Sequence, residues 1–190
     1  MIKRRGLTQE AVVRRAVEMA NSARDTDAVT LTGLAESLEI QPPSLYNHIA
    51  GLDGLRREMR RYALTRLSRS LRLAIAGQSG RKALVFAAHA YRQFAHENPG
   101  IYPLILSAVA DDDEAAREAL EEILTTLLLV LASLGLEGED AYHAVRGLRS
   151  LLHGFVSLEM SGGFGMPLEV EKSFQRVVDA YVEGMLGLAA

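Results

Sequence analysis

The chain has 190 residues, of which 48 % are hydrophobic and 24 % are charged. This composition is typical of a soluble globular protein and excludes a disordered chain. Cysteine is absent, which excludes disulfides, thiolate catalysis and cysteine-ligated zinc or iron–sulfur centres.

The charge is distributed unevenly along the chain. Residues 1–72 carry 13 Lys and Arg against 8 Asp and Glu, whereas residues 73–190 carry 8 against 16. A basic head on an acidic body predicts that only the head meets a polyanion, with random scatter of charge as the alternative.

The termini and apolar stretches predict a cytoplasmic protein. Met1 to Arg5 is basic, but the apolar run of a secretory signal does not follow it. The longest apolar stretch, residues 127–132, is far too short to cross a bilayer as a helix.

Helical periodicity dominates the chain, and no stretch alternates apolar and polar residues for long enough to predict a strand. Thr8 is expected to cap a first helix, whose inner face would hold Val12, Ala16, Met19, Ala20 and Ala23. Two short helices, capped by Thr30 and opened by Pro42, surround a turn at residues 39–41. Longer helices are expected over 53–76, 81–97, 114–134, 139–160 and 168–188. The pattern predicts an all-α fold of about nine helices, with an N-terminal domain over 1–52 and a larger helical domain over 53–190.

Residues 30–49 carry the strongest functional signal. Their apolar positions can converge on the first helix: Leu31, Leu34, Leu38, Ile40, Leu45 and Ile49. The second short helix then exposes small polar side chains, which are suited to reading base edges and contacting phosphates. Spacing alone leaves an ordinary helical hairpin open as the alternative.

The string LAESLEIQPPSLYNHIAGLDGLR, which begins at Leu34, resembles the helix-turn-helix of tetracycline-repressor (TetR, AcrR-like) transcriptional regulators. Leu45 to His48 match the Leu-Tyr-x-His/Tyr-Phe signature of that family, and the similarity covers residues 8–56. The resemblance implies a recognition helix in the major groove of double-stranded DNA. It assigns phosphate contacts to Thr30 and Thr32, and a DNA-facing surface to Gln41, Pro42, Ser44, Tyr46, Asn47 and His48.

Three positions depart from the family pattern. Glu39 stands where many relatives have Gly, and a positive φ there would cost about 1 kcal/mol. Ile49 replaces the usual aromatic residue, and Leu52 replaces a Lys that would contact a phosphate. Four arginines are candidates to replace that contact: Arg4, Arg5, Arg56 and Arg57.

The acidic body is larger than a monomeric DNA reader needs. TetR-like proteins use such a body to dimerise and to hold an inducer, and residues 149–165 resemble the His-Gly (WHG-type) C-terminal subgroup. Apolar stripes on the last two helices predict a homodimer through a four-helix bundle, with packing inside one subunit as the alternative. These stripes hold Val145, Leu148, Leu152, Phe155, Phe174, Val177, Val178, Tyr181 and Met185.

A further set of apolar and amphipathic residues suits a largely apolar ligand cavity, although each alone is more often plain core. The set is Phe86, His89, Ala90, Phe94, Tyr102, Leu106, Leu128, Tyr142 and His153. No cofactor, metal or catalytic site is expected. His89 and His96 lack a nearby third ligand, residues 111–114 lack the spacing of a calcium loop, and no nucleophile motif is present.

These observations predict a homodimeric repressor that an unidentified small molecule releases from a palindromic operator. Residues 53–76 would link the ligand-binding body to the DNA-binding head. An activator, or a regulator without a ligand, fits the same sequence. The alternatives of other classes are a small all-α enzyme or ligand-binding protein and a helical adaptor.

Overall fold

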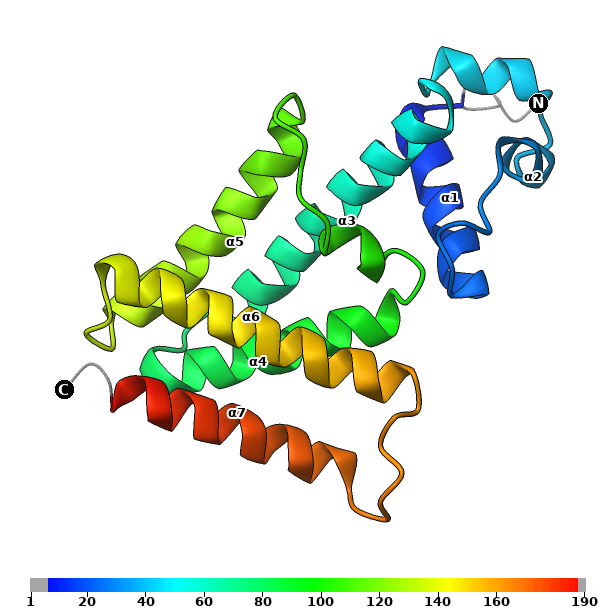
Figure 1. Ribbon diagram of the computed structural model, residues 1–190. Coiled ribbons are helices and arrows are strands. Elements are labelled where there is room, and N and C mark those ends of the chain that lie inside the picture. Colours follow the sequence, from blue (N-terminus) through cyan, green and yellow to red (C-terminus); the bar gives the residue numbers. More distant parts are fainter. Residues whose placement is uncertain (1–6, 188–190) are drawn as a thin grey trace. The chain divides into compact units, whose positions relative to one another are not determined.

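The computed structural model describes residues 7–187, which form seven α-helices and two 3-10 helices and contain no strand (Figure 1). The first elements are α1 (Gln9–Ala23), α2 (Leu31–Ser37), η1 (Pro42–Asn47) and α3 (Gly51–Ile75). They are followed by α4 (Gly80–Glu97), η2 (Tyr102–Ile105), α5 (Glu114–Ala132), α6 (Gly138–Met160) and α7 (Val170–Leu186). The predicted all-α fold is confirmed.

Arg4 and Arg5 lie outside the described residues. Within the described part, no helix combines the length and apolar character that a membrane span requires.

The chain divides into two compact units. The first unit holds the chain up to residue 66 together with residues 97–119, and the second holds residues 67–96 and the chain from residue 120. Residues 97–119 therefore pack with the N-terminal helices, which the sequence did not predict. The functional boundary after residue 52 stays a prediction.

Helix α1 begins as its sequence predicts. The Thr8 hydroxyl accepts a hydrogen bond from the backbone N–H of Ala11 at 3.2 Å. The inner face differs from the prediction, because Ala23 is exposed and Met19 is half-buried. The buried residues occur partly as neighbours in the sequence, which indicates that α1 packs on more than one side: Val12, Val13, Ala16, Val17 and Ala20.

The C-terminal end of α1 contacts the segment that follows α4. The backbone N–H of Gly100 donates to Oδ1 of Asn21 at 3.0 Å, and the Thr26 hydroxyl donates to the Gly100 carbonyl. A Cβ atom added at Gly100 would lie 2.0 Å from the carbonyl oxygen of Ala20. The two backbones can approach this closely only because residue 100 has no side chain.

The turn between α2 and η1 has the left-handed backbone that the sequence suggested, since Glu39 has a φ of 56°. We expect Glu39→Gly to raise the free energy of unfolding by roughly 0.5–1 kcal/mol, because glycine adopts this conformation without the steric cost of a Cβ atom. The matched control is Glu36→Gly in α2, which should lower stability by about 1 kcal/mol. Urea denaturation followed by circular dichroism measures both, and a less stable Glu39→Gly protein would contradict the strain.

In the second unit, α6 and α7 run side by side (Figure 1), and α7 is joined to α4 by a row of polar contacts. Arg81, near the start of α4, pairs with Asp179 at 3.1 Å and with Glu183. Farther along α4, Nε2 of His89 lies 2.9 Å from Oε1 of Gln175. Residues later in α4 thus meet residues earlier in α7, so the two helices are antiparallel.

Arg92 is the most enclosed cation of this row, with a side chain only 14 % exposed. Its guanidinium donates to both carboxylate oxygens of Glu159, at 2.8 and 2.6 Å, and also to Glu171. It lies over the ring of Phe174, 4.7 Å from the centroid. The hydrogen bonds to Glu159 raise the pKa of Arg92 above its ordinary value, against the opposing effect of burial. One side chain therefore connects α4, α6 and α7.

The predicted dimer stripes need correction, because five of their residues are buried inside this chain: Leu148, Leu152, Phe174, Val178 and Met185. Phe174 shows the reason. Its ring packs against the rings of His89 and Phe155, each 5.1 Å away between centroids. The inner faces of α6 and α7 are thus used within the subunit. The other four residues are only partly buried and still reach the surface: Val145, Phe155, Val177 and Tyr181.

Candidate nucleic-acid interface and body cavity

The segment expected to read DNA is a 3-10 helix, η1, rather than the α-helix that the sequence suggested. Two consecutive prolines, Pro42 and Pro43, provide no backbone N–H at its start. The first available donor, Ser44 N–H, bonds the Gln41 carbonyl three residues back at 2.9 Å. His48 N–H then bonds the Leu45 carbonyl at 2.8 Å in the same 3-10 pattern.

All eight residues predicted to face DNA reach the surface. Tyr46 is 63 % exposed. Thr30, Thr32, Gln41 and Asn47 are also exposed, and Pro42, Ser44 and His48 are half-buried. Side chains three residues apart eclipse in a 3-10 helix, so Ser44 shares a column with Asn47, and Pro43 with Tyr46. Pro43 is exposed as well and was missed from sequence.

Leu45 and Ile49 anchor this polar surface from below, with exposures of 1 % and 5 %. Helix α2 packs on both η1 and α1. The Thr30 hydroxyl accepts a hydrogen bond from the N–H of Gly33 at 3.1 Å and so caps α2. A capping hydroxyl of this kind keeps its own O–H to donate outward.

The arginines near the start of α3 differ in their partners. Arg56 donates to Asp27 at 2.6 Å, which holds it on the loop between α1 and α2. Arg57 lies 3.5 Å from Asp112, and both side chains are largely exposed. Leu52, where relatives carry Lys, is half-buried and apolar. Arg57 is therefore the more available cation at this end of α3.

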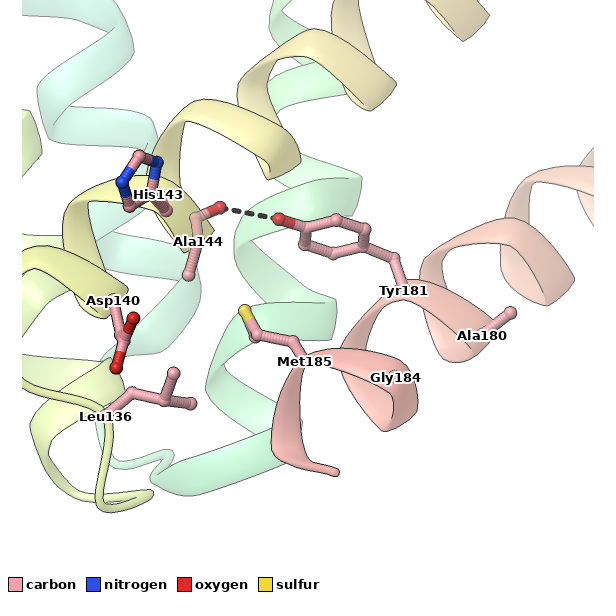
Figure 2. Close-up of a pocket in the computed structure, with 8 residues that line it drawn as sticks. All are labelled: Leu136, Asp140, His143, Ala144, Ala180, Tyr181, Gly184 and Met185. Atoms are coloured by element: carbon pink, nitrogen blue, oxygen red, sulfur yellow. Dashed lines mark hydrogen bonds between the residues drawn. The ribbon is translucent and has the colours of Figure 1, made fainter. Parts of the chain in front are cut away.

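The second unit contains a cavity of about 450 Å³ between the first half of α6 and the second half of α7 (Figure 2). Its floor is largely apolar, and Asp140 and His143 lie on its α6 side (Figure 2). The Tyr181 hydroxyl donates to the Ala144 carbonyl at 2.9 Å. Desolvation raises the pKa of Tyr181 above its ordinary value. The lining residues are Leu136, Asp140, His143, Ala144, Ala180, Tyr181, Gly184 and Met185.

Comparison with known proteins shows the family. The sequence profile described as "Tetracyclin repressor-like, C-terminal domain" matches residues 84–181. The uncharacterized HTH-type transcriptional regulator YobS of Bacillus subtilis is 35 % identical over 187 residues, which cover 98 % of this chain and 96 % of YobS. The chain belongs to the TetR family.

One further curated relative and one solved structure are also similar to this chain. The uncharacterized HTH-type transcriptional regulator Rv0681 of Mycobacterium tuberculosis is 35 % identical over 82 % of this chain and 72 % of its own length. A TetR variant from Acinetobacter baumannii AYE, solved in complex with minocycline, shares the fold at a TM-score of 0.72. Its sequence identity is 19 %, and the match covers 97 % of this chain and 99 % of that one. The His-Gly subgroup stays a prediction.

Membership of the TetR family does not show which residues of this chain contact a ligand. Phe86 and Tyr142, two of the residues predicted for a largely apolar ligand cavity, are 47 % and 54 % exposed. Each lies next to a buried alanine, Ala87 or Ala141, on the outward side of its helix, and an apolar residue type does not reveal that side. Tyr102 and Leu106 belong to the first unit, whereas the other seven belong to the second.

The remaining ligand candidates lie inside the second unit. Phe94 is buried, and four others are half-buried: His89, Ala90, Leu128 and His153. None of them lines the cavity between α6 and α7. That cavity was missed from sequence, because two of its lining residues, Tyr181 and Met185, lie on the apolar stripe that predicted a dimer contact. Within the described residues, no group of three or more His, Asp or Glu side chains is placed to hold a metal ion.

Proposed function

We propose that this TetR-family protein is a homodimeric repressor that binds a palindromic operator through η1 and is released by a small, largely apolar molecule. The observation that carries the proposal is the exposed polar surface of η1, held in place by buried Leu45 and Ile49. Such a surface offers donors and acceptors to base edges and phosphates in the major groove. Its partner is chromosomal DNA, so we place the protein in the cytoplasm.

We infer a dimer because η1 is short. One six-residue helix contacts too few base pairs for specificity, whereas two copies about 34 Å apart meet successive major grooves. The outer sides of α6 and α7 are the surface we propose for the two-fold contact, around the half-buried Val145, Phe155, Val177 and Tyr181. The cavity of Figure 2 lies beside Tyr181 on the same two helices.

The ligand is proposed to bind in the second unit, near His89, Phe94 and His153. The minocycline complex of the Acinetobacter protein is a property of that protein, and it supports a ligand here through the shared fold alone. To release DNA, the ligand must favour the non-binding state by several kcal/mol, because equal affinity for both states shifts no equilibrium. We propose regulation and not catalysis, since the relatives are named transcriptional regulators.

Selection of bound duplexes from a random library, followed by titration of the enriched site at several salt concentrations, tests DNA binding. We expect an inverted repeat and an affinity that falls steeply with salt. Tyr46→Ala and His48→Ala should each weaken binding about 10- to 100-fold, because each removes a polar contact to the duplex. Met166→Ala, which truncates a side chain that is 75 % exposed in the second unit, is the control and should change nothing. Absence of any enriched sequence would refute DNA recognition.

A further inference from the structure

The cavity between α6 and α7 (Figure 2) is separate from the ligand position of the proposed function, because His89, Phe94 and His153 do not line it. Its volume of about 450 Å³ lies within the range of small-molecule sites, which is roughly 300–1,000 Å³. The lining residues come from α6, α7 and the turn before α6, so the cavity is complete within one subunit. It can therefore be considered as a ligand site in its own right.

The floor of the cavity is apolar, and one wall is aromatic. Leu136, Ala144 and Met185 are buried, with exposures of 4 %, 5 % and 6 %. Tyr181 forms the wall, and its hydroxyl is already used in the hydrogen bond to the Ala144 carbonyl (Figure 2). A Cβ atom added at Gly147 would lie 2.2 Å from that hydroxyl oxygen, so the tyrosine can lie here only because residue 147 has no side chain. The wall thus offers a ligand an aromatic ring rather than a hydroxyl group.

The charged group of the cavity is a carboxylate. Asp140 lies on the α6 side and is exposed, and no Lys or Arg is among the lining residues. Within the described part of the chain, no ion pair engages the Asp140 carboxylate. Glu183, next to the cavity on α7, is paired with Arg81. His143, three residues after Asp140, adds a ring nitrogen to the same side. A ligand in the cavity would therefore meet one unpaired carboxylate above an apolar floor.

We propose that this cavity binds a small organic amine, whose ammonium group pairs with Asp140 and whose hydrocarbon body covers the floor. An ammonium group has several N–H donors, so the ring nitrogen of His143 can accept a second hydrogen bond. The hydrocarbon body removes Leu136 and Met185 from water, and an aromatic body also packs on Tyr181. An anion would lie beside a like charge, and a neutral body would desolvate the carboxylate without compensating it. The site goes beyond the proposed function and does not depend on DNA binding.

Isothermal titration calorimetry with phenylbutylamine tests the proposal on the whole protein. Phenylbutanol and phenylbutyrate are its neutral and anionic analogues, and they separate the effect of the ammonium group from that of the hydrocarbon. The wild type should bind phenylbutylamine about 10-fold more tightly than phenylbutanol, because a charge-assisted hydrogen bond adds to the same apolar contact. Phenylbutyrate should bind more weakly than either.

A first pair of variants tests the ion pair. Asp140→Asn should weaken phenylbutylamine binding about 10-fold and leave phenylbutanol binding unchanged. Glu139→Gln removes the same charge from the preceding exposed residue, which does not line the cavity, and is the control. It should change neither affinity by more than about two-fold.

A second pair of variants tests the location. A Cβ atom at Gly184 would meet no atom within 4 Å, and Gly184 lines the cavity, so the side chain of Gly184→Leu can occupy the space of the ligand. This variant should lose binding of both the amine and the alcohol. Gly165→Leu, at an exposed glycine with the same free space in the loop between α6 and α7, should bind both as the wild type does.

Each contrary result identifies the part that fails. A wild type that binds none of the three compounds, or that prefers phenylbutyrate, would overturn the amine as the ligand class. Equal affinity of wild type and Asp140→Asn for phenylbutylamine would overturn the ion pair. Unchanged binding by Gly184→Leu would show that the amine binds elsewhere, and the proposal would be wrong. Operator binding is measured separately, so its failure would refute the proposed function and leave these results intact.

Discussion

Gly100→Ala should destabilise the first unit by roughly 2–4 kcal/mol, one of the two largest effects we expect from a single substitution. The added Cβ atom would lie 2.0 Å from the Ala20 carbonyl oxygen and 2.6 Å from the Asn21 nitrogen, which are backbone atoms of α1. A helix backbone cannot rotate away as a flexible side chain can. The contact must therefore open, and the hydrogen bond from Gly100 to Asn21 is lost with it.

Urea denaturation followed by circular dichroism measures this effect. The control is Gly165→Ala, because a Cβ atom there meets no atom within 4 Å and the loop is exposed. It should change stability by less than about 0.5 kcal/mol. Equal stability of Gly100→Ala and Gly165→Ala would mean that α1 and residues 98–101 do not touch as described.

Glu159→Ala should destabilise the second unit by about 2–4 kcal/mol. Arg92 and Glu159 are both only 14 % exposed, and the substitution leaves the guanidinium beside the ring of Phe174 without its bidentate partner. Breaking an enclosed pair in this way leaves a charge without compensation, which costs more than the pair itself contributes. Glu169→Ala removes a carboxylate from an exposed pair with Lys172 and should cost less than about 0.5 kcal/mol.

The pH dependence of the Glu159→Ala effect follows from the pKa of Glu159. Hydrogen bonding from Arg92, and to a lesser extent from His96, lowers that pKa below its ordinary value. A carboxyl with a lowered pKa in the folded state stabilises the protein above its unfolded pKa of about 4.3. This contribution is lost as the pH falls through the folded value. The stability gap between wild type and Glu159→Ala should thus be constant from pH 7 to about 5 and shrink toward pH 3. A gap that widens in acid would contradict the pairing.

The head of the protein could be predicted from sequence because its determinants are local. Thr8 and Thr30 both cap helices at the predicted positions. The positive φ of Glu39 follows from the position of a three-residue turn between two short helices. The hydrophobic pattern could not predict that η1 is a 3-10 helix. The type of helix depends on which backbone N–H groups remain after the two prolines.

The body could be predicted only as far as its helices. The spacing of apolar residues identifies a stripe, but the same stripe serves a core, a cavity or a dimer contact. Phe174 is an example, since it is enclosed by His89, Phe155 and Arg92, which lie on two other helices. The partners of a residue such as Arg92 are far away in sequence, and no local pattern reveals them.

If η1 reads DNA as proposed, its 3-10 geometry also limits how many base pairs one subunit can recognise. Six residues at about 2.0 Å per residue extend roughly 12 Å, which spans three to four base pairs at about 3.4 Å each. In the proposed dimer, two copies would then specify about seven base pairs. A site of that length recurs by chance about once in 16,000 base pairs, which is roughly 60 to 600 times among some 10⁶–10⁷ competing positions. Base contacts alone would spread this regulator over many chance matches. The remaining discrimination must come from how readily each candidate duplex bends and adjusts its groove width to fit the protein.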